Sequence, residues 1–329
     1  MRIVTTLPSA TETVAALGLE PVGVSHECDY PPSAASAPAV TSSPIDAAGS
    51  SGEIDQQVLE TADTEGGLYE VDIETLDDLE PDVIVTQGMC DVCAVDVAVI
   101  EDAVAKIDAD PEIVPTDPHS VADVLDDLER IGRAIGYEDR ARAVRRDLEA
   151  RIETVRNRTA DRTAEDRPRV AIFDWTDPVM IAGHWTAELV DWAGGEYGLA
   201  AVGEASSPRE WDDIRAYDPE VVIAAPCGFD LEQTAANRTD LTDRDGWDEL
   251  TAVREGRVWA MDGDHYLNRP GPRLVDTLEA LAPIVSPDRF DGPDPDVAVP
   301  FGELEALETL ETEREPTDSD ARAEVDPSS

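Results

Sequence analysis

The chain has 329 residues, 41% of them hydrophobic, which is enough for two domains that each bury a core. Acidic residues outnumber basic ones by 74 to 25, and the resulting net charge of −49 repels a phosphate backbone, so nucleic acid is excluded as a partner. No apolar run approaches the roughly 18 residues of a membrane-spanning helix, so no transmembrane segment is expected.

The basic residues are almost all arginine, with Lys106 as the only lysine, and this balance is typical of proteins from salt-accumulating halophiles. Because salt at about 1 M shortens the Debye length to about 3 Å, we expect the fold to be lost in dilute buffer. The first residues, MRIVTTLPSATETVAALG, show no basic stretch followed by an apolar one. They predict a cytoplasmic protein, or an extracytoplasmic one only if the translation start is misassigned.

The chain opens with a strand–helix–strand pattern. Residues 2–6 predict a short strand, and Ser9 with Glu12 three positions later has the spacing of a capping box. A helix is predicted over 10–17 and a second strand over 21–25. A strand, a helix and a strand in this order predict a parallel sheet.

The same design returns in the second half. The stretches LDDLEPDVIVTQGMC (76–90) and IRAYDPEVVIAAPCGF (214–229) share a helix end, a proline, an acidic residue, an apolar strand and a cysteine. Between them, residues 120–158 keep helical spacing of apolar side chains, with a break around Gly136. The predicted domains are an N-terminal α/β lobe (1–117), a connecting backbone helix (118–158), a C-terminal α/β lobe (168–288) and an acidic, largely disordered tail (289–329).

Residues with binding chemistry follow the predicted strands. In open α/β sheets, ligands bind at the carboxyl ends of strands. The positions concerned are Cys28, Cys90, Cys93, Cys227, His26 and His265. Three interpretations of the cysteines compete: packing beside a ligand, a thiolate-rich zinc or iron site, and a redox dithiol formed by Cys90 and Cys93. The third is the weakest, because Asp91 and Asp96 would raise the thiol pKa.

Catalytic motifs are missing from the sequence. It contains no phosphate-binding glycine loop, no nucleophile elbow and no pair of zinc-ligand histidines at helical spacing. The sequence therefore gives no support for a hydrolase or a transferase, and we expect no enzymatic activity and no required cofactor.

Four stretches carry a family resemblance: LPSATETVAALGLEPVGVSHECDYP (7–31), GHWTAELVDWAGG (183–195), PCGF (226–229) and DHYLNRPGPRLVDTLEALA (264–282). Together they resemble the cobalamin-binding branch of the class III substrate-binding proteins of ABC importers for iron-siderophores and vitamin B12, in a haloarchaeal-type acidic version. The resemblance runs from Arg2 to about Pro287. It implies two Rossmann-like α/β lobes joined by a long backbone helix, with a ligand cleft between the lobes.

The resemblance also implies a set of site residues. The ligand would lie between a first-lobe wall of Ser9, Ala10, His26, Tyr30 and Gln87 and a second-lobe wall of Trp175, His184, Trp185, Trp211, His265 and Tyr266. Glu74 and Asp212 would dock onto arginines of an ABC permease. The implied function is capture of a corrinoid, cobalamin, by a monomer, for uptake or intracellular delivery. A metal-binding protein with ligands Cys28, Cys90, Cys93 and Cys227, and a Cys-x-x-Cys thiol oxidoreductase, are the alternatives.

Overall fold

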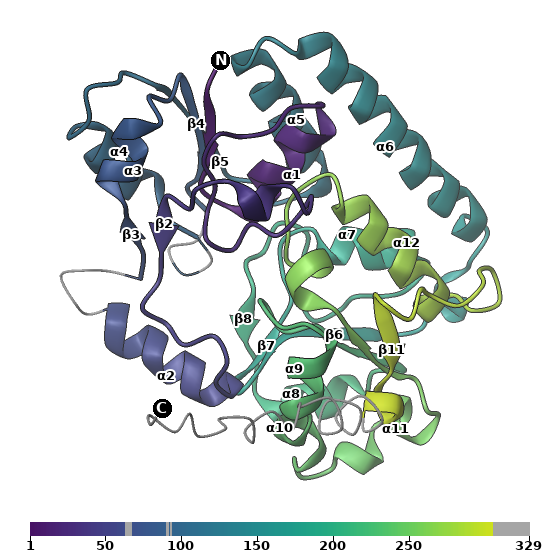
Figure 1. Cartoon of the computed structure of the whole chain (residues 1–329). Coiled ribbons are helices and arrows are strands. Elements are labelled where there is room, and N and C mark those ends of the chain that lie inside the picture. Colours follow the sequence, from purple (N-terminus) through teal and green to yellow (C-terminus); the bar gives the residue numbers. More distant parts are fainter. Residues whose placement is uncertain (63–67, 90–91, 93, 305–329) are drawn as a thin grey trace, which may run out of the picture.

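Two main sheets, one in each half of the chain, organise the molecule (Figure 1), and a small two-stranded sheet accompanies the first of them among the described residues. The structure is a computed structural model that describes residues 1–62, 68–89, 92 and 94–304. The first sheet is parallel, in the order β1 (Ile3–Thr5), β4 (Val83–Gln87), β5 (Glu112–Thr116). The second sheet has the order β11 (Ala298–Pro300), β10 (Val258–Met261), β9 (Val221–Ala224), β6 (Val170–Thr176), β7 (Val179–Ile181), β8 (Ser207–Pro208). No helix within the described ranges is long and apolar enough to cross a membrane.

The remaining first-lobe elements surround its sheet. They are α1 (Pro8–Ala16), η1 (Ala34–Ser36), β2 (Thr41–Ser42), α2 (Ser51–Ala62), β3 (Glu70–Val71), α3 (Ile73–Asp78) and α4 (Val97–Val104). The predicted strand over 21–25 pairs with β1 only through a parallel bridge between Val4 and Gly23. The predicted strand–helix–strand order and its parallel pairing are therefore confirmed, although the second strand is reduced to a bridge.

The predicted capping box at the start of α1 is wrong. The helix begins at Pro8, and Leu7 caps it without a side-chain hydrogen bond. Glu12 is instead buried, and its carboxylate accepts hydrogen bonds from Arg269 and Arg273 of the second lobe. Two guanidinium groups bind a carboxylate more strongly than a backbone amide does, so this tertiary contact outcompetes the local cap.

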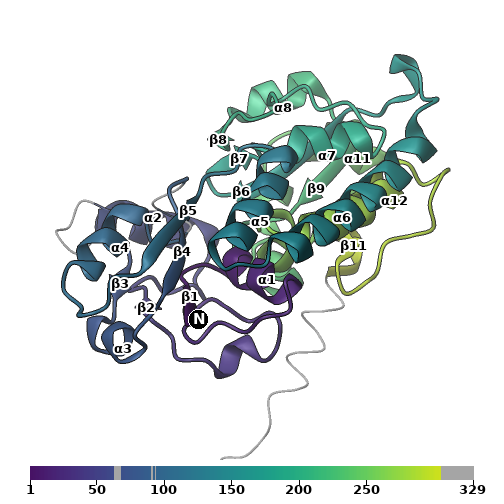
Figure 2. The ribbon, with the colours of Figure 1, turned by 90° about the horizontal axis from the view of Figure 1, so that it is seen from above.

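The connector is a pair of helices, α5 (Val121–Ala134) and α6 (Glu138–Thr159), which lie side by side in Figure 2. The predicted break at Gly136 is confirmed, since that residue has a φ of +74°. Helix α5 packs on α1 and β5 of the first lobe, whereas α6 packs on helices of the second lobe. The long α6 therefore forms the rigid link between the lobes.

The second lobe is built around six strands: β6 (Val170–Thr176), β7 (Val179–Ile181), β8 (Ser207–Pro208), β9 (Val221–Ala224), β10 (Val258–Met261) and β11 (Ala298–Pro300). Its helices are η2 (Ala164–Asp166), α7 (Thr186–Trp192), α8 (Trp211–Tyr217), α9 (Leu231–Ala236), α10 (Thr239–Thr242), η3 (Trp247–Glu249), α11 (Thr251–Arg254), η4 (Gly263–Leu267), α12 (Leu274–Val285) and η5 (Phe301–Glu303). Because β6, β9 and β10 are mutually parallel, their carboxyl ends share one edge.

The second lobe extends further than predicted. Strand β11 pairs antiparallel with β10, and Val297, Val299 and Phe301 are buried. Residues 289–304 thus belong to the lobe, because an apolar stretch that completes a sheet edge outweighs the acidic composition around it. The rest of the predicted tail, 305–329, lies outside the described residues.

The repeated pattern of the two halves is confirmed in three dimensions. Helix α3 leads to β4 and α8 leads to β9, in each case through an acidic residue with positive φ followed by proline. Those residues are Glu80 (φ 42°) before Pro81 and Asp218 (φ 48°) before Pro219. Two copies of one helix–strand unit therefore place equivalent helix starts on the two lobes.

Two further features tie the lobes together. One continuous hydrophobic cluster contains Ala10 and Val14 of α1 together with Leu274 and Leu278 of α12. In addition, residues 43–62, which we call the strap, leave the first lobe and run to the second, so that α2 lies beside it at the lower left of Figure 1. A shared core and a second chain crossing favour a rigid relative placement of the lobes.

The strap is anchored mostly by neutral groups, together with one carboxylate, that of Asp240, which accepts a hydrogen bond from the Ser51 hydroxyl. The Ser51 amide donates to Oδ1 of Asn237 at 3.0 Å, and the Thr176 hydroxyl lies 3.1 Å from the Ser51 hydroxyl. The Gln233 side chain donates to the carbonyl oxygen of Ala47 at 2.5 Å. Ser51 is completely buried, so water does not compete for these bonds.

Candidate functional site

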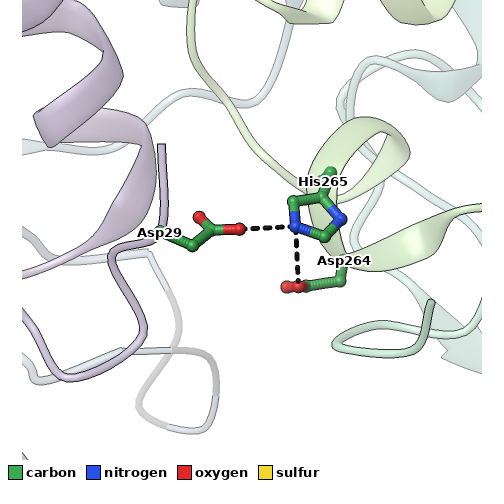
Figure 3. A group of neighbouring side chains, drawn as sticks. All are labelled: Asp29, Asp264 and His265. Carbon is green, nitrogen blue, oxygen red and sulfur yellow. Dashed lines mark ion pairs between the residues drawn. The ribbon is translucent and has the colours of Figure 1, made fainter. Parts of the chain in front are cut away.

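Charged side chains of the two lobes meet in a group that we call the charged junction: Glu12 and Asp29 of the first lobe, and Asp264, His265 and Arg269 of the second. Figure 3 shows Asp29 pointing across to His265, with Asp264 beside it. Asp29 lies in the loop that follows the β1-bridging segment, whereas Asp264 and His265 lie in η4, directly after β10. The junction thus sits at a strand end, where the sequence predicted binding residues.

Asp262 fixes the His265 imidazole. As the N-cap of η4 it accepts a hydrogen bond from the His265 amide at 2.7 Å, and its other oxygen accepts the Nδ1 proton at 2.7 Å. This hydrogen bond, followed by the one to Asp29, raises the pKa of His265 to about 10. The ring is therefore held with Nε2 directed at the first lobe.

Arg269 is the hub of the charged junction and is only 5% exposed. Its Nη1 donates to Asp29 at 2.6 Å and to Glu12 at 3.1 Å, and its Nη2 donates to Asp264 at 3.0 Å. Burial raises the pKa of Glu12 against the opposing effect of two arginines. Burial would also raise the pKa of Asp29, but hydrogen bonds from His265 and Arg269 hold it well below its usual range.

An arginine sandwiched between two tyrosines borders the charged junction. The Arg273 guanidinium lies 4.3 Å from the ring centroid of Tyr30 and 4.6 Å from that of Tyr266. Arg273 also donates to Glu12 at 3.2 Å. Tyr30 belongs to the first lobe and is 44% exposed, so this stack presents aromatic surface where the lobes meet.

The structure therefore brings together three predicted residues, Tyr30, His265 and Tyr266. The sequence reasoning did not assign the charged groups that connect them: Glu12, Asp29, Asp262, Asp264, Arg269 and Arg273. A usable signal was present, because each of them lies inside or next to a stretch that carries the family resemblance. Arginines within those stretches are also conspicuous in a chain with so few basic residues.

The other second-lobe residues divide between surface and core. Trp175, at the end of β6, packs against Phe229 with 5.2 Å between ring centroids and remains partly exposed. Trp185 is only 4% exposed, and its indole donates to the carbonyl oxygen of Leu267 at 2.9 Å. The prediction that Trp185 lines a wall is wrong for this structure; the indole supports the end of η4 from within the core.

Two more predicted residues lie away from the charged junction. His184 has a φ of 53° and stacks on Trp185, and its ring centroid lies 5.4 Å from that of His119. Burial, followed by the nearby His119, lowers the pKa of His184. Trp211 stacks on Trp247 in a separate hydrophobic cluster of the second lobe and remains partly exposed, and its assignment to the ligand wall stays a prediction.

The predicted first-lobe wall consists largely of supporting residues. Ser9 and Ala10 are buried, and Ala10 belongs to the hydrophobic core. Gln87 is 3% exposed and binds the carbonyl oxygen of Ala94 at 3.0 Å, which shapes the loop after β4. His26 is partly exposed, lies 3.1 Å from the Thr41 hydroxyl through Nδ1, and has a pKa that burial lowers.

The cysteines do not assemble a metal site within the described residues. Cys28 is buried against the Thr11 hydroxyl at 3.1 Å, and burial raises its thiol pKa to about 11, so the thiolate is disfavoured. Cys227 follows β9. Cys90 and Cys93 lie outside the described residues. Within the described ranges, the one group of three ligand side chains contains no cysteine.

The predicted permease-docking residues occupy equivalent places. Glu74 is the second residue of α3 and Asp212 is the second residue of α8, the two helices of the repeated unit. Both side chains are exposed. A pair of acidic groups thus stands at matching helix starts on the two lobes.

Two linked α/β lobes, with aromatic and charged side chains where they meet, are the architecture of a two-lobed binding protein. The chain matches the model of the periplasmic binding protein family over residues 3–265 and belongs to this family. In sequence it is 24% identical to an uncharacterized ABC transporter substrate-binding lipoprotein, YvrC of Bacillus subtilis (strain 168), over 88% of this chain and 81% of that protein.

Solved structures share the fold. The periplasmic vitamin B12 binding protein BtuF of Vibrio cholerae matches with a TM-score of 0.62 and 22% identity, over 86% of this chain and 96% of that one. The periplasmic heme-binding protein RhuT from Roseiflexus sp. RS-1 matches with a TM-score of 0.64 and 22% identity, over 88% and 99%. The likeness to proteins with different ligands establishes the architecture rather than the ligand.

The family confirms two predictions and corrects a third. The two-lobed α/β fold is confirmed, and so is the prediction of a binding protein rather than an enzyme. The predicted cytoplasmic location is wrong, because the family is one of periplasmic proteins and the relative from Bacillus subtilis is a lipoprotein.

Proposed function

We propose that the protein is the substrate-binding component of an ABC importer and that it holds a corrinoid, cobalamin, between its lobes. The observation that carries the proposal is the stack of Tyr30, Arg273 and Tyr266, in which aromatic faces and a cation from both lobes meet. A corrinoid is a broad, mostly apolar macrocycle with amide arms, and its binding calls for aromatic surface plus a few hydrogen-bond donors.

Two further observations support this assignment. Trp175, partly exposed at the end of β6, offers a further aromatic side chain, which the buried Phe229 supports from behind. Glu74 and Asp212 stand at equivalent helix starts on the two lobes, a placement that would suit a permease with two arginine sites. In a chain with a net charge of −49, the second observation supports the proposal less than the first.

Haem is the second candidate ligand. A tyrosine can serve as an axial ligand of haem iron, and the Tyr266 ring lies beside the Arg273 guanidinium, 4.6 Å from ring centroid to guanidinium. The same stack therefore has chemistry for either flat macrocycle. The two ligands differ in which part of the stack binds them: haem needs the phenol oxygen, whereas a corrinoid needs the aromatic face.

The test is a titration of the full chain at high salt with cyanocobalamin and, separately, with haemin, followed by tryptophan fluorescence and visible absorbance. We expect cobalamin to bind, with an affinity at least tenfold lower in Tyr266→Ala and nearly unchanged in Tyr266→Phe. Tyr137→Ala, which removes an exposed tyrosine at the turn between α5 and α6, is the matched control. Binding of haemin alone, lost in Tyr266→Phe, would replace the corrinoid by haem; cobalamin affinities equal in all variants would refute the proposed site.

A further inference from the structure

Three side chains in the charged junction have the types and spacing of metal ligands. One carboxylate oxygen each from Asp29 and Asp264 and a ring nitrogen of His265 all lie within 4.8 Å of one another. Figure 3 shows them converging from the two lobes. Their exposed fractions, 38%, 36% and 33%, leave room for water to complete a coordination shell.

A second layer of residues orients each of these ligands. Asp262 accepts the Nδ1 proton of His265 at 2.7 Å, which leaves Nε2 to face Asp29. Arg269 holds Oδ1 of Asp29 at 2.6 Å and Oδ1 of Asp264 at 3.0 Å, so that the Oδ2 atoms face His265. Protein metal sites use this arrangement of a carboxylate behind the histidine and hydrogen bonds behind the carboxylates.

The backbone that carries two of the ligands is rigidly placed. Helix η4 is a single π-helical turn, and Asp262 caps it. A side chain at Gly263 would come within 2.1 Å of the carbonyl oxygen of Pro226, so this turn packs directly on the backbone after β9. Single π-helical turns occur often at functional sites, and here the turn fixes the positions of both Asp264 and His265.

The local charge balance favours a divalent cation. The carboxylates of Glu12, Asp29, Asp262 and Asp264 bring four negative charges, while Arg269, Arg273 and the protonated His265 bring three positive ones. Independently, Oε2 of Glu12 is buried without a hydrogen-bond partner, although the Glu12 side chain is only 1% exposed. One divalent ion in place of the His265 proton would bring this group from one excess negative charge to neutrality.

We propose that Asp29, Asp264 and His265 bind one divalent first-row transition-metal ion, which clasps the two lobes together. Two oxygens and one imidazole nitrogen suit ions from Mn²⁺ to Zn²⁺, and water fills the remaining positions. The ion takes the place of the proton that His265 shares with Asp29, and that proton leaves to solvent. The site uses none of the four cysteines as a ligand and does not depend on which ligand the protein carries.

The test uses the full chain, stripped with a chelator and dialysed at high salt to suppress diffuse binding to the acidic surface. Mn²⁺ is the probe, because the electron paramagnetic resonance signal of the free ion falls when the ion binds. We expect one tight site in the wild type, with at least tenfold weaker binding in Asp264→Asn and in His265→Gln. Asp288→Asn and His119→Gln are the matched controls and keep the site.

A second measurement tests the clasp itself. Mn²⁺ should raise the thermal midpoint of the wild type and of both controls, and should leave that of Asp264→Asn unchanged, because a ligand stabilises only the form that binds it. Binding in Asp264→Asn equal to that in Asp288→Asn, or no tight site in the wild type, overturns the proposal. Loss of the site in a Cys90→Ser, Cys93→Ser double variant would assign the ion to the cysteines and would also overturn it.

Discussion

The lobes are joined by two contacts of opposite chemical character. The charged junction uses carboxylates, a histidine and an arginine, whereas the strap is held mainly by neutral groups such as the Ser51 amide and the Asn237 amide. Asp29 and His265 of the charged junction remain about one-third exposed, whereas Ser51 of the strap is wholly buried. The difference shows that the strap is anchored out of contact with water, whereas the charges of the charged junction remain accessible to it.

Energetics sharpen this comparison. A neutral buried hydrogen bond contributes about 1 kcal/mol net, and its loss depends little on salt. Removing one partner of a buried ion pair is more damaging, because the remaining charge stays uncompensated. The two contacts should therefore respond very differently to single substitutions.

The largest effect is expected for Arg269→Ala. This change leaves Glu12, Asp29 and Asp264 without their shared guanidinium, and we expect the free energy of unfolding to fall by about 3–5 kcal/mol. Urea denaturation at high salt measures this change in the free energy of unfolding, because urea is uncharged and leaves the ionic strength unchanged. Arg289→Ala, which removes an exposed arginine paired with Asp161, is the control and should leave stability nearly unchanged. A similar, small effect for both variants would show that the charged junction does not join the lobes.

Asp174→Asn tests a buried carboxyl that has no arginine. Asp174 is bonded to the Ser206 hydroxyl, its Oδ1 has no hydrogen-bond partner, and burial raises its pKa to about 6. The folded state therefore holds this proton more tightly than the unfolded state, so the free energy of unfolding falls by up to about 3 kcal/mol as the pH rises from about 4 to 6. In the Asp174→Asn variant, this decrease in the free energy of unfolding should be absent.

The measurement is a series of urea denaturations between pH 4 and pH 7. Asp102→Asn, an exposed substitution, should keep the wild-type pH dependence. An unchanged pH dependence in Asp174→Asn would mean that Asp174 is not the group that titrates in this range.

The smallest effect is expected at the strap. Asn237→Ala removes the acceptor of the Ser51 amide, which should cost about 1–2 kcal/mol and speed hydrogen exchange within residues 43–62. Gln56 is an exposed residue of α2 whose side chain is hydrogen-bonded to Glu60. The control variant Gln56→Ala should change neither the stability nor the hydrogen-exchange rate. Exchange of residues 43–62 that is already fast in the wild type would contradict an anchored strap.

The local elements were accessible from sequence because their signals are local. The proline after each helix, the β-branched strands and Gly136 each act through their own backbone or nearest neighbours. Glu12 shows the limit of such reasoning: its capping spacing was present, but Arg269 lies 257 positions away and binds it more strongly. Trp185 shows a second limit, since a tryptophan in a predicted loop gave no sign that Leu267 would cover it.

The sequence by itself determined the two repeated α/β lobes and the helical connector, because periodicity and the order of turn signals reflect local backbone pairing. The class of binding protein came from the four stretches that resemble a known family. Only the tertiary structure decided which side chains face one another between the lobes. That choice depends on distances of a few ångström between Asp29 of one lobe and Asp264, His265 and Arg269 of the other. No spacing along the chain encodes such distances, because they arise from how the connector, the shared core and the strap position two separate sheets.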